Sequence, residues 1–366
     1  MTKSSNATIL ILDAGGTNLV FKAVSNGEIM PKKITLPAQA NTLDELLGKI
    51  ISGFQDINIL TGNRAAAISF CFPGPADYKN GIIGDLENMP LFRGGVPLKK
   101  MLENKFKIPV FINNDGDLFT LGEAIGGLLP EVNRKLAEAG VDKQYKNLLG
   151  VTLGTGFGGG IVQNSRLFTG DNSAGAEINR MVNPLKWETS VEDTLSIQGL
   201  KDLFAKKAGM DISNIPEPAE IFRIGTGEIE GDKCAAEDAW STFGAVLADA
   251  LANALTLIDG IAVIGGGLSG AYHLFLPKTI EMMNRTFTRS DGRKFPRMEV
   301  AAYNLEDENS RQQFLNYQKK MIRVPFSDET IPYYEEKKTG VGISRLGTSD
   351  AVALGAYAFA AEKLGF

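Results

Sequence analysis

The sequence predicts an α/β fold built from two related halves. Short apolar segments, typical of buried strands, alternate with stretches that have the apolar spacing of helices. A strand, a glycine turn and a second strand occur twice, at residues 9–24 and again at 148–162. The chain has 366 residues, which is enough for two domains. We therefore expect two α/β domains that repeat one architecture.

The first half opens with a buried strand at residues 9–12, which the polar and glycine-rich segment 13–17 interrupts. A strand resumes at 19–24, and Asn26-Gly27 is a strong hairpin turn signal. Apolar runs and helical spacing predict the elements that follow: strands near 33–36, 65–72 and 110–113, and helices at 44–54 and 117–126.

The second half repeats the opening pattern with a strand at 148–153, a glycine-rich turn at 154–160 and a strand at 161–162. Residues 284–340 are charged and aromatic without a simple period, and we interpret them as an insertion. The remaining elements are a long Ala/Leu-rich helix at 235–258, a strand at 261–264, a helix from about Ser269 and a final alanine-rich helix at 349–363.

Composition narrows the classes of function. A net charge of -5 lacks the electrostatic footprint of a nucleic-acid binder. No apolar stretch reaches the length of a membrane span, and the run at 9–12 is too short for a signal peptide, so we expect no membrane partner and a cytoplasmic location. Two cysteines alone cannot form a Cys-rich zinc site.

The glycine turns are suited to phosphate. Glycine lets backbone N–H groups approach phosphate oxygens closely, and Thr17 and Thr155 add hydroxyl donors. A third glycine turn at 265–267 strengthens the prediction of a bound nucleotide, although Gly15-Gly16 alone is equally compatible with a tight hairpin. No Walker A sequence occurs, and a strand rather than a helix follows 154–160. Asp13 either caps its turn or holds Mg²⁺ through water.

These segments together resemble the ROK family of sugar kinases, in the actin/hexokinase/Hsp70 superfamily. The resemblance spans nearly the whole chain. The glycine loops mark only the superfamily, whereas the segments at 114–123 and 174–178 are more specific to ROK. The motifs that carry it are Asp-x-Gly-Gly-Thr at 13–17, Pro-Gly-Pro at 73–75, Asn-Asp at 114–115, Leu-Gly-Glu at 121–123, Leu-Gly-Thr-Gly-x-Gly-Gly-Gly at 153–160, Ala-Gly-Ala-Glu-Ile at 174–178 and Gly-Gly-Gly-Leu-Ser at 265–269.

The resemblance implies two ribonuclease-H-like (actin-like ATPase) domains with an interdomain cleft that takes ATP, Mg²⁺ and a sugar. We expect a smaller domain of residues 1–117 plus 348–366 and a larger one of 118–347 that carries the insertion at about 284–340. Homodimers are common in the family, so a homodimer is among the expected partners, although the sequence indicates no interface.

The same resemblance assigns the site. Asp115 matches the catalytic base, and the adjacent Asn114 matches a sugar-hydroxyl ligand. Glu177 matches a sugar-binding glutamate, and Glu192 resembles a later one. Asp117 is interpreted as a first-turn helix charge. The residues expected to bind ATP with Mg²⁺ are Asp13, Gly15, Gly16, Thr17, Gly154, Thr155, Gly156, Gly266 and Gly267.

Two departures from the family pattern concern the sugar and zinc. Asn179-Arg180 stands where the family usually has Gly-His, and Arg180 could bond a sugar hydroxyl or pair with a carboxylate. The segment 182–187 contains no cysteine where the family's zinc motif should follow, so we expect no zinc site.

The sequence thus predicts an ATP-dependent, glucokinase-like sugar kinase that phosphorylates a hexose at the 6-position. The alternatives are a kinase for an N-acetylated hexosamine, a catalytically weak sugar-binding regulator of the same fold, and another phosphotransferase of the superfamily.

Overall fold

We describe the protein from a computed structural model that places residues 7–14, 18–74, 76–84, 90–211 and 214–366. The chain divides into two compact units. Unit 1 comprises residues 1–127, 159–177 and 345–366, and unit 2 comprises residues 128–158 and 178–344. The two units are described separately below.

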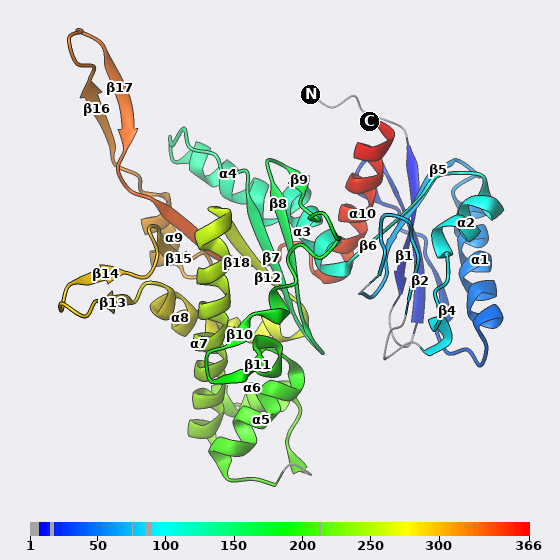
Figure 1. Cartoon of the computed structure of the whole chain (residues 1–366), viewed down its shortest axis with the longest axis horizontal. Helices are drawn as coiled ribbons and strands as arrows, with labels where there is room; N and C mark the ends of the chain where they lie inside the picture. Colours follow the sequence, from blue (N-terminus) through cyan, green and yellow to red (C-terminus); the bar gives the residue numbers. More distant parts are fainter. Residues whose placement is uncertain (1–6, 15–17, 75, 85–89, 212–213) are drawn as a thin grey trace. The chain divides into compact units, whose positions relative to one another are not determined.

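Unit 1 is a sheet with helices on both faces (Figure 1). Its elements are β1 (Thr8–Ala14), β2 (Asn18–Ser25), β3 (Glu28–Ile29), β4 (Ile34–Pro37), α1 (Leu43–Leu60), β5 (Ala65–Cys71), a 3-10 turn η1 (Pro90–Phe92), α2 (Leu98–Phe106), β6 (Val110–Asn113), α3 (Asp115–Gly126), β9 (Arg166–Leu167) and α10 (Thr348–Leu364). The strand order is β3-β2-β1-β5-β6, with β4 paired to β2. β1, β5 and β6 run parallel, so their carboxyl ends meet at one edge of the sheet.

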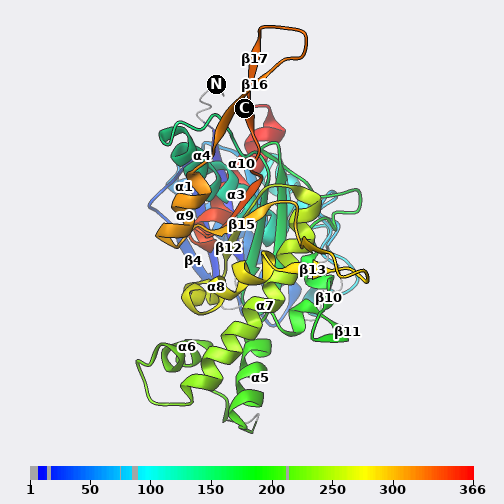
Figure 2. The same ribbon diagram turned by 90° about the vertical axis from the view of Figure 1, so that its left-hand side faces the viewer.

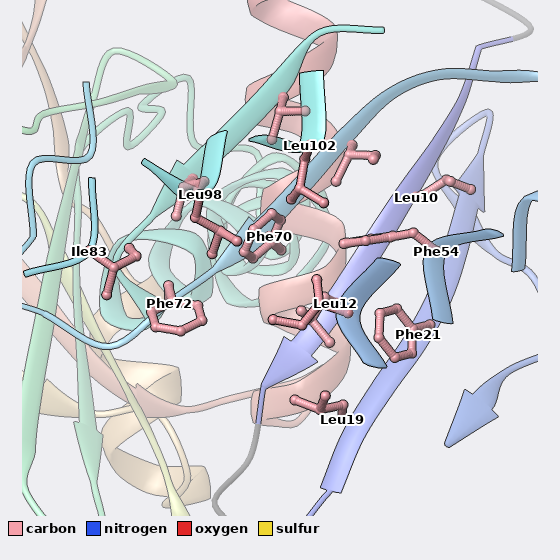
Figure 3. Packing of buried hydrophobic residues seen from close by; sticks show 14 of the residues in the cluster. Leu10, Leu12, Leu19, Phe21, Phe54, Phe70, Phe72, Ile83, Leu98 and Leu102 are labelled. Atoms are coloured by element: carbon pink, nitrogen blue, oxygen red, sulfur yellow. The ribbon is translucent and has the colours of Figure 1, made fainter. Parts of the chain in front are cut away.

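One face of this sheet packs against α1 and α2 through a large apolar core (Figure 3). The alternating residues Leu10 and Leu12 of β1 point into this core, as the period of two in a strand requires. Aromatic rings fill its centre: Phe21 and Phe54 lie 5.1 Å apart in an edge-to-face arrangement. Such pairs add about 1 kcal/mol each to the burial of their surface.

The helices α3 and α10 pack on each other at backbone distance. A Cβ at Gly122 of α3 would collide with the backbone of Ala351, and one at Gly355 of α10 would collide with the backbone of Leu118. Glycine at these two positions is what lets the helices approach so closely. This contact holds the C-terminal helix against the helix that carries Asp115.

Unit 2 contains a parallel sheet whose order includes β15-β18-β12-β7. Its strands and 3-10 turns are β7 (Leu148–Leu153), η2 (Ile178–Arg180), β10 (Val182–Asn183), β11 (Lys186–Ser190), η3 (Val191–Asp193), β12 (Ile261–Gly265), η5 (Gly267–Ala271), β13 (Thr286–Thr288), β14 (Lys294–Pro296), β15 (Ala301–Asn304), β16 (Lys319–Arg323), β17 (Thr330–Tyr334) and β18 (Lys338–Ile343). The strand β8 (Phe157–Gln163) carries the chain from unit 2 into unit 1.

The helices of unit 2 are α4 (Leu128–Glu138), α5 (Ile197–Ala208), α6 (Pro218–Thr226), α7 (Lys233–Ile258), α8 (Tyr272–Met283) and α9 (Glu308–Leu315). The long helix α7 is apolar enough to cross a membrane by length and composition, but more than half of its apolar window is buried in the unit. Trp240 of α7 stacks on Phe275 of α8, and Phe243 of α7 packs against the same ring at a tilted angle. We therefore interpret α7 as a core helix.

Two hairpins project from unit 2 (Figures 1 and 2). In the sequence, each lies between two strands of the sheet of unit 2. They are β13–β14 and the longer β16–β17, whose strands are almost fully exposed. The segment 284–340, expected as an insertion, also supplies β15, α9 and the start of β18. Part of it is therefore integral to the sheet, because β15 pairs with β18 and β18 with β12. The sequence did not indicate these strands, since both are short and β15 has only one buried residue.

The structure repeats one pattern of parallel strands, as the sequence predicts. In unit 1 the first strand β1 is followed across the sheet by β5 and β6, and in unit 2 the first strand β7 is followed by β12 and β18. The compact units differ from the predicted domains by placing residues 118–127, 159–177 and 345–347 in unit 1.

Candidate functional site

Asp115 is the first residue of α3, directly after the strand β6. Asn114 caps the helix, because its side-chain oxygen accepts a hydrogen bond of 2.8 Å from the backbone N–H of Gly116. The same N–H also donates to Asp115 Oδ1 at 2.9 Å. The sequence predicted a helix that starts at residue 117. The cap at Asn114 starts α3 two residues earlier, at Asp115.

Solvent reaches Asp115, but the surrounding protein removes much of the water around its carboxylate. This desolvation raises the pKa of Asp115, and the nearby charge of Asp13 adds to the increase. The N–H of Gly116 acts in the opposite direction by stabilising the charged form. Asp115 is thus a carboxylate at a helix N-terminus, accessible from outside and with raised basicity.

Asp13 lies near the end of β1 and is half-buried. One of its oxygens accepts a hydrogen bond of 2.8 Å from Ser349 Oγ, at the start of α10. Because β1 and β6 are parallel members of one sheet, Asp13 near the end of β1 and Asp115 after β6 lie at the same edge. Two neighbouring carboxylates repel each other, and a bound cation would relieve that repulsion.

Asp117 lies in the first turn of α3 as expected, but it is not a solvated charge. Only 6% of the residue is exposed. Burial, together with the charges of Glu177 and Asp115, raises the pKa of Asp117 to about 8. A charge at a helix start is usually solvated, so the sequence alone gave no reason to expect a protonated carboxyl here.

Glu177 is exposed and belongs to unit 1 with Asn114 and Asp115. The negative charge of Glu177 contributes to raising the pKa of Asp117 and of Tyr78. The buried Tyr78 hydroxyl donates to the backbone oxygen of Phe72 at 2.9 Å and lies beside the Asn114 side chain. Unit 1 therefore gathers a tyrosine and several carboxylates around the start of α3. Tyr78 was missed from the sequence, where only its proximity to the Pro-Gly-Pro motif could have indicated it.

In unit 2 the two described glycine turns lie together. Gly154–Gly156 follows β7 and Gly266–Gly267 follows β12, which is parallel to β7 and paired with it. Gly266 has φ 86°, and a Cβ there would collide with the backbone of Leu153. Thr155 is exposed at the tip of its turn. The turn is shorter than expected, because strand β8 already begins at Phe157.

Glu192 and Arg180 also lie in unit 2. Glu192 Oε2 accepts a hydrogen bond of 2.8 Å from the backbone N–H of Phe157, and it lies against Gly156. Glu192 thus fixes the end of the glycine turn, a structural role that the sequence did not indicate. Arg180 is exposed at the end of the 3-10 turn η2.

Gly15, Gly16 and Thr17 lie outside the described residues, so their predicted contact with phosphate stays a prediction. Within the described ranges, no three His, Cys, Asp or Glu side chains form a group that could hold a metal ion. The expected lack of zinc is not tested by this observation. A single carboxylate such as Asp13, acting through water, remains compatible with Mg²⁺, which uses few protein ligands.

Comparison with known proteins agrees with this architecture. A glucokinase from Parabacteroides distasonis has a solved structure that is 45% identical, covers 99% of both chains and superimposes with a TM-score of 0.89. An N-acetyl-D-glucosamine kinase from Photobacterium profundum is 28% identical over 291 residues, which cover 73% of this chain and 87% of that protein. A ROK family glucokinase from Streptomyces griseus was solved with glucose and AMPPNP. It is 18% identical, the match covers 96% of this chain and 98% of that chain, and the TM-score is 0.56.

The predicted α/β fold class and the resemblance to sugar kinases are both confirmed by these relatives. The model of the ROK family matches residues 9–312, which includes β1, α3, both described glycine turns and Glu192. With more than four-fifths of the chain matched and a relative at 45% identity over its whole length, this protein belongs to the ROK family.

Proposed function

We propose that this protein is an ATP-dependent sugar kinase that transfers the γ-phosphate of ATP to the 6-hydroxyl of a hexose. Membership of the ROK family and the similarity to a glucokinase support the activity. The observation that carries the proposal is Asp115, an accessible carboxylate of raised pKa at the N-terminus of α3. A general base needs both accessibility and increased basicity.

Asp115 would accept the proton of the sugar hydroxyl as that oxygen attacks phosphorus. Phosphoryl transfer has a loose transition state, so alignment of the hydroxyl contributes more than its nucleophilic strength. Asn114 is held by its hydrogen bond to Gly116 N, which fixes the amide beside the base. Asn114 and Glu177 would orient the ring through its other hydroxyls, with Glu192 and Arg180 as further candidates from unit 2.

The phosphates of ATP would be held by backbone N–H groups of the turn Gly154–Gly156, with the hydroxyl of Thr155. Gly266 and Gly267 would lie against adenosine and the α-phosphate, since their turn adjoins the first one at the ends of β7 and β12. Gly15, Gly16 and Thr17 complete the proposed phosphate contacts. These backbone donors stabilise charge without the cost of burying a cation.

Asp13 would hold Mg²⁺ through water, since its carboxylate lies near that of Asp115 and is oriented by Ser349. When bound, Mg²⁺ supplies positive charge that neutralises the phosphate oxygens.

Glucose is the first candidate substrate. N-acetyl-D-glucosamine is the second, because one relative is an N-acetyl-D-glucosamine kinase and the match covers 87% of that protein. An ADP-release assay with ATP and Mg²⁺ across a panel of hexoses and N-acetylated hexosamines decides between them. Absence of ADP release with every sugar, in protein that still binds one of them, would instead indicate the sugar-binding regulator.

The assignment of the base is tested with Asp115→Asn. We expect kcat to fall by a factor on the order of 10²–10⁴, because proton transfer to a positioned base contributes about that much. The matched control is Asp56→Asn, which removes an exposed carboxylate from α1. Near-normal turnover of Asp115→Asn would refute Asp115 as the base. Cytoplasmic location and assembly as a homodimer also remain proposals.

A further inference from the structure

Unit 1 contains a cavity of about 560 Å³ beside the first turn of α3. Its walls come from β6, from α3, from the segment that begins at β9 and from the end of α10, and every residue that lines it belongs to unit 1. A volume of this size accommodates a small organic ligand.

Two buried polar groups face this cavity. Asn113 and Asp117 both line it, and they are 4% and 6% exposed. Within the part of the chain that the structure describes, Asn113 Nδ2 and Asp117 Oδ1 have no hydrogen-bond partner. A buried polar group without a partner destabilises the protein, so a ligand that bonds to both atoms would gain binding free energy.

The cavity adjoins the proposed sugar site, but Asn114, Asp115 and Glu177 do not line it. Asn113 and Asn114 are consecutive residues in extended backbone, so their side chains point to opposite sides. Asp115 and Asp117 are two residues apart on a helix and do not share a face. The buried Tyr78 side chain also lines the cavity. Its hydroxyl donates to the backbone oxygen of Phe72 and lies beside the Asn114 side chain.

Cations and aromatic rings form part of the lining, which also includes the acidic residues Asp171 and Glu362. The lysines that line it are Lys79, Lys99 and Lys363. Lys99 Nζ donates a hydrogen bond of 3.3 Å to the backbone oxygen of Lys79. Arg166 also lines the cavity but pairs with Glu362 at 3.5 Å. Phe111 and Phe359 form an edge-to-face wall with ring centroids 6.0 Å apart. Ammonium groups suit an anion, whereas an aromatic wall beside buried amide and carboxyl groups suits a polyol.

We propose that this cavity binds a phosphorylated sugar as a second ligand of the protein. The phosphate lies against the three lysines, and the sugar hydroxyls bond to Asn113 and Asp117. The choice of a phosphorylated hexose rests on the proposed function, because this is the class of product that a hexose kinase makes. The cavity itself does not depend on that activity.

The test is calorimetric titration of glucose 6-phosphate into the full chain with glucose and AMPPNP at saturation, which fill the proposed active site. We expect one additional site for glucose 6-phosphate. The double variant Lys79→Met/Lys99→Met should weaken its affinity at least tenfold, because charge-assisted hydrogen bonds to phosphate are lost. Methionine keeps the apolar stem of each lysine, so the fold should be retained, and thermal unfolding checks this.

The matched control is Lys100→Met, which removes an exposed lysine next to Lys99 that does not line the cavity. It should bind as the unchanged protein does. Glucose alone and inorganic phosphate alone should each bind more weakly than glucose 6-phosphate. The proposal is overturned if no additional site is found, if the double variant binds normally, or if inorganic phosphate binds as tightly as the sugar phosphate.

This outcome is separable from failure of the proposed function. If the hexose panel shows no phosphoryl transfer, the titration is repeated without glucose and AMPPNP. Dependence of binding on Lys79 and Lys99 still supports the cavity in that case, and independence from them still refutes it.

Discussion

Replacing Asp117 by asparagine should remove a large pH dependence from the stability of the protein. The pKa of Asp117 is raised from 3.8 to about 8 by burial and by the charges of Glu177 and Asp115. In the unfolded chain the carboxyl ionises near 3.8, whereas in the folded protein it keeps its proton up to about pH 8. Between these values unfolding releases a proton, so stability falls as pH rises.

The size of this effect follows from the shift. Each unit of pKa corresponds to about 1.4 kcal/mol, so the free energy of unfolding should fall by about 1.4 kcal/mol per pH unit across this window. From pH 5 to pH 8 the loss attributable to Asp117 is on the order of 4 kcal/mol. The contribution is complete below pH 3.8, and the loss reaches its limit above about pH 8.

Urea unfolding at pH 5, 6, 7 and 8 measures this slope directly. Asp117→Asn keeps the size and polarity of the side chain but cannot ionise, so its slope should be shallower than that of the unchanged protein by about the amount above. Asp56→Asn, at an exposed position of α1, should leave the slope unchanged. If Asp117→Asn and the unchanged protein lose stability in parallel, Asp117 is ionised in the folded state and the reasoning fails.

Two further predictions concern backbone contacts, and urea unfolding measures both. Gly122→Ala should destabilise unit 1 by about 3 kcal/mol, because its Cβ would collide with Ala351, whereas Gly48→Ala on α1 meets nothing within 4 Å and should stabilise by about 1 kcal/mol. Gly266→Ala should cost about 3 kcal/mol through its φ of 86° and its contact with Leu153, whereas Gly267→Ala has free space and should cost less than 1 kcal/mol. Equal effects within either pair would contradict the close approach.

Several strands of both units could be predicted because their apolar runs are short, buried and bounded by turns. The segments predicted at 110–113 and 148–153 coincide with β6 and β7. The turn at Asn26-Gly27 is also confirmed, since both residues have positive φ between β2 and β3. Local chemistry determines these features, so no knowledge of the tertiary fold was needed.

The glycines at 158–160 show where local chemistry is insufficient. The sequence suggested that they extend the phosphate turn, but they lie in β8. A Cβ at Gly160 would collide with the backbone of Gly116 in α3, so this glycine serves helix packing instead. The pairing of a strand with a helix more than 40 residues earlier in the chain cannot be read from composition.

The sequence predicted where the candidate residues lie on strands and helices better than it predicted their surroundings. Asp115 and Asn114 lie where a strand meets a helix, as expected, and Asp13 lies near the end of β1, two strands away in the same sheet. The hydrogen bond from Phe157 N to Glu192 joins residues 35 positions apart, so no sequence pattern indicates it. Glu192 can therefore affect the turn Gly154–Gly156 whether or not it also contacts sugar.

The protonation of Asp117 also bears on how Asp115 could act as a base. Asp13, Asp117 and Glu177 each place a carboxyl group near the start of α3. If Asp117 were ionised at neutral pH, its negative charge would further favour the protonated, inactive form of Asp115. By retaining its own proton up to about pH 8, Asp117 leaves one charge fewer beside Asp115. The burial of one carboxyl thus helps its neighbour, two residues earlier on the same helix, to remain ionised and able to accept a proton.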